Sequence, residues 1–195
     1  MRVKVISFFT QAYTCAAAEL HDSCKTYNLD AYICHLSEFP SWAHGVCHKP
    51  QFILDSMKAF PEYDGYLWTD ADSVFKRQPD FEVFADCHFS AHKFKRSPAH
   101  EEEILTGTFW LANTPTLGSM VKEWAENTER YIRTFTPEQH SLKEVLPRWG
   151  SQILFKNMDP EWVWILDDFK EIYGKRNPIV HHHQMSRELR YTKKL

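Results

Sequence analysis

Two carboxylates stand at the end of an apolar run in the first half of the chain. The run YLWT, residues 66–69, leads directly into Asp70 and Asp72, which are one residue apart. In an α/β sheet, ligands gather beyond the carboxyl ends of the strands, so this is where a bound cation would be held. Oxygen ligands favour magnesium or manganese over zinc, and such an ion can bridge a diphosphate. Asp-x-Asp alone is a weak motif, and the plainer interpretation is an acidic turn.

The length and composition indicate one ordinary globular domain over residues 1–195. Hydrophobic residues make up 43% of the chain and aromatic residues 15%, which allows a sizeable core. The net charge of −3 gives no overall basic field and weighs against indiscriminate nucleic-acid binding. Five cysteines without CxxC spacing suit reduced thiols, and no apolar run reaches the roughly 18 residues of a membrane span. We expect a cytoplasmic protein (host cytoplasm if phage-encoded) without integral membrane association.

Strand and helix patterns alternate through the first 70 residues. Strands are expected at 3–9, 31–36 and 66–69, with one helix over 14–27 and another from Pro50 to Phe60. Later patterns predict short strands at 89–91, 108–112, 162–166 and 179–180, and helices that begin near Thr114 and at a capping box from Thr136 to Gln139. The alternation predicts an α/β fold with a mixed, mainly parallel sheet flanked by helices.

The order of these motifs resembles that of the GT-A nucleotide-sugar glycosyltransferases. In that family a Lys-Pro opens a helix, a strand follows, and an apolar run ends in Asp-x-Asp with a proline further on. The corresponding segment here is HKPQFILDSMKAFPEYDGYLWTDADSVFKRQP. Three further segments resemble its nucleotide loop and first helix, its acceptor-side strand and helix, and its later acidic-Gln helix: ISFFTQAYTCAAAELHDSCKTYN, LTGTFWLANTPTLGSMVKEW and PEQHSLKEVL. The resemblance implies a Rossmann-like GT-A fold, with a nucleotide-sugar-binding half (1–80) and an acceptor-side half ending in a metal-binding segment (81–195).

The resemblance also implies roles for residues of the donor site. Asp70 would lie near the ribose and the metal, and Asp72 would ligate the metal directly. Thr10 and Tyr13 would face the nucleoside, although a helix cap and a core tyrosine explain them equally well. Lys49 would approach the donor phosphate or ribose as a point charge, with a solvated lysine as the alternative.

Three adjacent histidines end the strand-like pair at 179–180, where the family supplies a histidine to the metal and diphosphate. We expect His181 to be this ligand because it comes first after the apolar pair. Side chains alternate along a strand, so His183 points the same way and is the reserve, whereas His182 faces the other way. An accidental or tag-like histidine run is the alternative.

The catalytic helper is implied at Glu138 and Gln139, which match the acidic-Gln position at the head of a helix. Thr136 and Gln139 also satisfy a capping box without any catalysis. Gly107 and Thr108 would line the sugar pocket, where a glycine permits close approach. The acidic-Gln resemblance favours retention of the anomeric configuration.

Together these implications predict a glycosyltransferase that moves a hexosyl or pentosyl group from a UDP- or GDP-sugar to an acceptor hydroxyl, with Mn²⁺ or Mg²⁺ as cofactor. A nucleotidyltransferase would also use paired aspartates, but it would normally carry a glycine- and lysine-rich loop that ISFFTQAYT lacks. A nucleotide-sugar-binding protein without transfer activity is the other alternative.

Two classes of acceptor fit the sequence. One is a saccharide or cell-surface precursor. The other is a hydroxymethylated base in phage-type DNA, for which the basic runs at 93–97 and 187–194 could meet phosphate. A base in a duplex would first have to be flipped out of the stack.

Overall fold

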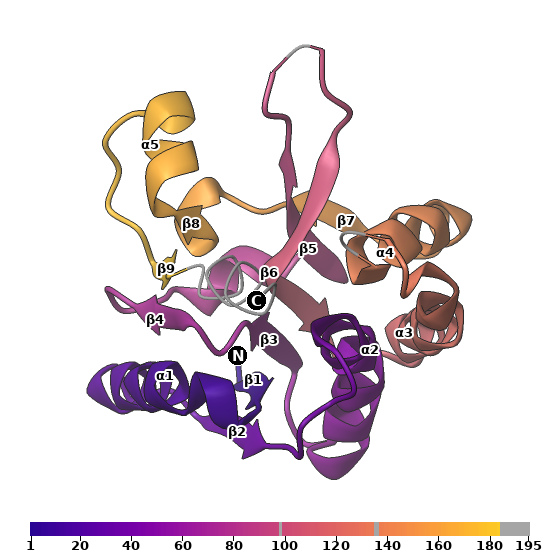
Figure 1. The fold of residues 1–195 in the computed structure, drawn as a ribbon, viewed down its shortest axis with the longest axis horizontal. Helices are drawn as coiled ribbons and strands as arrows, with labels where there is room; N and C mark the ends of the chain where they lie inside the picture. Colours follow the sequence, from indigo (N-terminus) through magenta and orange to yellow (C-terminus); the bar gives the residue numbers. More distant parts are fainter. Residues whose placement is uncertain (98, 135–136, 184–195) are drawn as a thin grey trace.

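The centre of the protein is a six-stranded mixed sheet (Figure 1). The computed structural model describes residues 1–97, 99–134 and 137–183. Three strand pairs are parallel (β1–β2, β1–β3 and β5–β7) and two are antiparallel (β3–β6 and β5–β6). The strand order is β2 (Ala31–His35), β1 (Val3–Phe9), β3 (Gly65–Thr69), β6 (Glu103–Ala112), β5 (Phe89–Phe94) and β7 (Phe155–Asn157). The predicted α/β fold with a mixed, mainly parallel sheet is confirmed.

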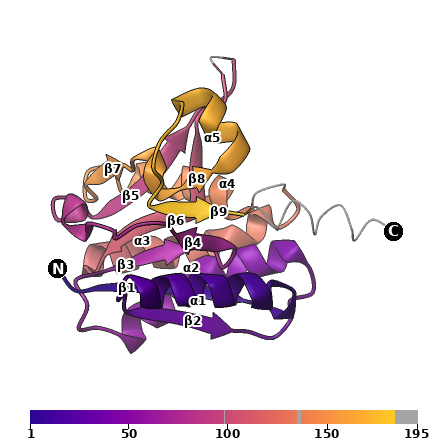
Figure 2. The ribbon, with the colours of Figure 1, turned by 90° about the vertical axis from the view of Figure 1, so that its left-hand side faces the viewer.

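Helices cover both faces of this sheet (Figures 1 and 2). One face packs against three of them: α2 (Trp42–Ala59), α3 (Pro115–Thr128) and α4 (Pro137–Arg148). The other face packs against α1 (Thr14–Thr26) and a second, smaller sheet. Successive residues of β3 divide between the two cores, since Trp68 joins the first and Leu67 the second. The strand is therefore apolar on both sides, as expected for a strand inside a covered sheet.

The first strand of the smaller sheet follows directly after the turn at the end of β3. It has the strand order β4 (Ser73–Phe75), β9 (Val180–His182) and β8 (Trp164–Ile165). β4 and β9 are antiparallel, which sets Ser73 opposite His182. A further helix, α5 (Leu166–Tyr173), follows β8. The two sheets are thus joined covalently by residues 70–72.

Two predicted boundaries were wrong. The second helix begins at Trp42 and not at Pro50, because Ser41 caps it by accepting a hydrogen bond from the His44 amide. Pro50 lies inside this helix, which gives up the hydrogen bond that residue 50 would otherwise donate. The strand expected over 162–166 is reduced to Trp164–Ile165, since Pro160–Trp162 forms a 3₁₀ turn capped by Asp159.

One predicted helix start agrees with the structure, and two predicted segments lie outside the described residues. Thr114 caps α3 as expected, accepting a hydrogen bond from the Leu117 amide. Thr136 of the expected capping box lies outside the described residues, as do the basic residues 187–194. Among the helices that the structure describes, none combines the length and the apolar character needed to cross a membrane.

A pair of glycines tests this packing. A Cβ on Gly65 would lie 2.2 Å from Trp110 Cη2 and 2.6 Å from the Leu111 carbonyl oxygen. Gly65→Ala should therefore destabilise the protein by about 3 kcal/mol, measured by urea unfolding. Gly118→Ala is the matched control, because its Cβ would meet Met57 Cε at an ordinary 3.9 Å and should stabilise α3 by about 0.5–1 kcal/mol. Equal effects of the two substitutions would contradict the packing of β3 against β6.

Candidate active site

Asp70 and Asp72 occupy the turn between β3 and β4, at the carboxyl end of β3. The Asp70 amide donates to the Gly107 carbonyl of the adjacent strand (2.7 Å), and the Ser73 amide closes the turn on the Asp70 carbonyl (3.1 Å). The Asp72 carbonyl accepts from the His183 amide (2.8 Å). Both sheets therefore hold the backbone of this turn in place. Asp72 is buried, at 6% exposure, and Asp70 is half-buried.

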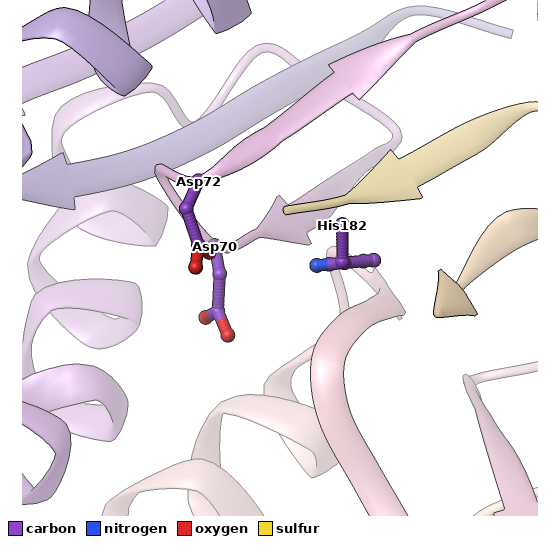
Figure 3. Close-up of side chains that lie close together, drawn as sticks. All are labelled: Asp70, Asp72 and His182. Carbon is purple, nitrogen blue, oxygen red and sulfur yellow. The ribbon is translucent and has the colours of Figure 1, made fainter. Parts of the chain in front are cut away.

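A histidine from β9 completes the group. Ligand atoms of Asp70, Asp72 and His182 all lie within 4.8 Å of one another, and their side chains face a common space (Figure 3). Oxygen and nitrogen atoms bound to one cation at 2.0–2.6 Å are at most about 5 Å apart, so this spacing fits a single divalent ion. Two carboxylates and one imidazole suit manganese or magnesium better than a thiolate-preferring metal.

Burial keeps His182 neutral. Its pKa is lowered to about 3, first by burial and then by the neighbouring charges of His181, Lys49 and His183. A neutral imidazole keeps a lone pair, which metal ligation requires. The ring lies against Gly107, where an added Cβ would come within 3.0 Å of its Cε1 atom, and its Nε2 is 2.9 Å from Thr108 Oγ1. Gly107 and Thr108 thus contact the histidine, and neither is among the residues lining the pocket described below.

The structure brings His182, and not His181, to the aspartates. The side chains alternate along the strand as expected, but it is His182 that faces the aspartates, whereas the rings of His181 and His183 contact each other. His181 packs its ring against that of His183 (5.2 Å between centroids), and His183 Nε2 lies 3.7 Å from Glu19 of α1. His181 Nε2 is buried without a hydrogen-bond partner among the described residues. The apolar pair before the histidines carries no signal for which of them faces the turn.

Lys49 is buried between two carboxylates. Its ammonium donates to Asp70 Oδ1 (3.0 Å) and to the Thr106 carbonyl (2.8 Å), and it lies 3.7 Å from Glu138 Oε1. Trp68 Nε1 also donates to Asp70 Oδ1 at 3.0 Å. Lys49 is 3% exposed, so it is not a solvated lysine. Its contacts are those of a residue that positions carboxylates.

Glu138 lies at the head of α4 and is also buried. Its Oε1 accepts a hydrogen bond from Thr106 Oγ1 (2.9 Å), and its backbone carbonyl accepts from Trp124 Nε1 (3.0 Å). Its second carboxylate oxygen, Oε2, is buried without a hydrogen-bond partner in the part of the chain that the structure describes. Gln139 is partly exposed and does not line the adjoining pocket.

A pocket of about 400 Å³ opens beside these residues. Six of the residues predicted from the sequence line it: Thr10, Tyr13, Lys49, Asp70, Asp72 and Glu138. Five further lining residues are aromatic. Phe8 and Phe9 precede Thr10, Trp68 lies in the run before Asp70, and Phe39 and Trp42 come from a segment that the sequence analysis did not single out. A wider hollow of about 1160 Å³ runs between α2 and α3 and is lined by none of the predicted site residues. The pocket at the end of β3 is therefore the candidate active site.

The architecture matches that of a solved glycosyltransferase structure. The match is to "a glycosyltransferase involved in the glycosylation of the major capsid of PBCV-1", with a TM-score of 0.75, 15% sequence identity and coverage of 100% of both chains. This chain shares the fold of that solved structure. At this level of identity the likeness concerns the fold. No family model matches the chain, and no curated protein sequence matches it.

The buried histidines predict a pH-dependent stability. Burial also lowers the pKa of His181, to about 4, with help from the charges of His183 and Lys76. Each histidine titrates near pH 6.5 when unfolded, so below that pH the unfolded state binds more protons and folding weakens until the folded pKa is reached. Each should remove about 2 kcal/mol between pH 8 and pH 5.

Urea unfolding of the metal-free protein across this range measures the effect. His182→Gln should flatten the pH dependence by roughly one proton. His21→Gln, at an exposed position on α1, is the matched control for the loss of an imidazole. A pH dependence that survives intact in His182→Gln would show that His182 is not buried in its neutral form.

Proposed function

We propose that the protein is a divalent-cation-dependent glycosyltransferase that moves a hexosyl or pentosyl group from a nucleoside diphosphate sugar to an acceptor hydroxyl. The observation that carries this proposal is the grouping of Asp70, Asp72 and His182 at the edge of a 400 Å³ pocket. The glycosyltransferase fold supports the same reaction class. The donor would be a UDP- or GDP-sugar.

The formal charges of the site fit a divalent ion. Asp70, Asp72 and Glu138 carry three negative charges and Lys49 one positive charge, which leaves a net charge of −2 with the histidine neutral. A bound Mn²⁺ or Mg²⁺ would offset this charge and stabilise the departing diphosphate. Asp70, Asp72 and His182 are the residues that would hold the ion.

The pocket itself would bind the nucleoside. Thr10 and Tyr13 follow β1 at the same edge of the sheet as the aspartates, and aromatic rings form much of the wall. Flat apolar rings bind a base by stacking and exclude water from the diphosphate. The pocket volume lies within the range of small-molecule sites.

Glu138 would act at the sugar. Thr106 and Lys49 fix its Oε1, and Oε2 is left to face a ligand. We place it beside the anomeric carbon or a sugar hydroxyl, and we assign retention of the anomeric configuration. Gln139, the next residue on α4, lies outside the pocket lining, so we place the helper role on Glu138.

Charge pairing on the β5–β6 hairpin favours a saccharide acceptor over DNA. Lys93, the first residue of the basic run, lies 3.3 Å from Glu102 across the hairpin, and the neighbouring Glu101 pairs with Lys143 of α4 at 2.5 Å. Charges that are neutralised in this way offer little net attraction to phosphate. The neighbour of the same fold is involved in the glycosylation of a capsid and not of DNA.

Metal removal and site substitutions test the reaction. Donor turnover in the presence of pooled acceptors, followed by mass spectrometry, should stop with a chelator and return with Mn²⁺ or Mg²⁺. Asp72→Asn and His182→Asn should lower turnover at least about 100-fold, because the first removes the negative charge of a carboxylate ligand and the second removes the imidazole. His181→Asn should have a much smaller effect.

Asp55→Asn, at an exposed position on α2, is the matched control for loss of a carboxylate. Normal turnover of Asp72→Asn, or turnover that a chelator does not change, would refute the proposal. The acceptor pool should contain oligosaccharides and hydroxymethylated DNA, and product is expected on the oligosaccharides. Product only on DNA would overturn the acceptor assignment and leave the donor site intact.

A further inference from the structure

Four buried side chains form a continuous chain of hydrogen bonds behind the aspartate turn. Ser73 Oγ is 2.7 Å from the Asp70 carbonyl oxygen and 2.6 Å from Thr69 Oγ1. Thr69 Oγ1 is in turn 3.0 Å from Thr108 Oγ1, and Thr108 Oγ1 is 2.9 Å from His182 Nε2. The three hydroxyl residues are 0% exposed, and His182 is 6% exposed.

This chain joins the two sheets. Thr69 and Thr108 are direct partners across the β3–β6 pair of the large sheet, and Ser73 and His182 are direct partners across the β4–β9 pair of the small sheet. The hydrogen bonds run from one pair to the other around residues 70–72. The side chains that bracket the aspartates are thus held by one another, away from solvent.

The direction of the chain follows from counting hydrogens. A hydroxyl has one hydrogen to donate. The Asp70 carbonyl can only accept, so the Ser73 hydroxyl donates to it and must accept from Thr69. The Thr69 hydrogen is then used, so Thr69 accepts from Thr108. Thr108 has no hydrogen left for the histidine, and it must accept one from His182 Nε2.

We infer that His182 is held as the tautomer with hydrogen on Nε2, which leaves Nδ1 as the ring nitrogen that ligates the cation. Thr108, Thr69 and Ser73 are positioning residues, because they act on the metal site through the histidine. The ligand half of this inference rests on the proposed cation site, whereas the tautomer follows from the hydrogen bonds alone.

The opposite direction is disfavoured by a short contact. If Thr108 donated to Nε2, then Thr69 would have to donate to Thr108 and Ser73 to Thr69. Ser73 Oγ would then face the Asp70 carbonyl oxygen at 2.7 Å with no hydrogen between them. Two buried oxygens at this distance repel one another, so the arrangement that satisfies all four contacts prevails.

NMR of the metal-free protein tests the tautomer directly. Long-range ¹H–¹⁵N correlation spectra of protein labelled with ¹⁵N-histidine distinguish the protonated from the bare ring nitrogen, and His182→Gln assigns the signal. We expect hydrogen on Nε2 at neutral pH. Ser73→Ala removes the anchor three hydrogen bonds from the ring, so the chain can reverse and the population should move towards hydrogen on Nδ1.

Manganese binding tests the ligand. Titration of free Mn²⁺ by EPR should give an affinity about tenfold weaker for Thr108→Val, which keeps the shape and loses the acceptor, and near wild type for Thr108→Ser. Ser90→Ala is the control, because Ser90 is a buried strand hydroxyl without a hydrogen-bond partner among the described residues. Its affinity should not change.

Two results would overturn the inference: hydrogen on Nδ1 of His182 in the wild type, or no response of the tautomer to Ser73→Ala. An unchanged manganese affinity of Thr108→Val would overturn the positioning role. Hydrogen on Nε2 in a protein that does not bind Mn²⁺ would support the tautomer and overturn the proposed cation site, so the two failures can be told apart. Circular dichroism melting of each variant verifies that it is folded.

Discussion

The buried ammonium of Lys49 is the interaction on which the site depends. It joins α2 to the turn after β3, to β6 and to the head of α4 through Asp70, Thr106 and Glu138. A buried charge is costly unless it is paired and hydrogen-bonded, and removal of one partner leaves the others uncompensated. The cluster therefore fixes two carboxylates at the wall of one pocket, with a net formal charge of −1 on the three groups.

The strand pattern predicted where the two aspartates lie, and the family resemblance supplied the other residues that line the pocket with them. A doubly apolar strand that ends in Asp70 and Asp72 can only lie inside a sheet, and its carboxyl end lies at the same edge as the loop with Thr10 and Tyr13. These residues do line one pocket with Lys49 and Glu138. The sequence pattern could not predict which side chains pair with one another in the site. Lys49 was predicted to approach the donor phosphate or ribose, and within the protein it is paired with carboxylates 21 and 89 residues further along the chain (70 − 49 and 138 − 49).

The remaining differences have the same origin in long-range pairing. β4 and β7 have three residues each, too few for a periodic signal. They form because β4 pairs with β9 and β7 pairs with β5. The register of β9 on β4 decides that His182 faces the turn, and a shift of one residue would have selected His181. The hydrogen bonds among Thr69, Ser73 and Thr108 likewise could not be predicted from the sequence, because they form only when both sheets are in place.

The most direct test of the central claim is pulsed EPR of Mn²⁺ bound to the protein together with a nucleoside diphosphate. The account predicts that one ion shows coupling both to phosphorus and to a histidine nitrogen, and that the nitrogen coupling disappears in His182→Gln and persists in His181→Gln. Absence of nitrogen coupling in the wild type, or nitrogen coupling that survives in His182→Gln, would contradict it.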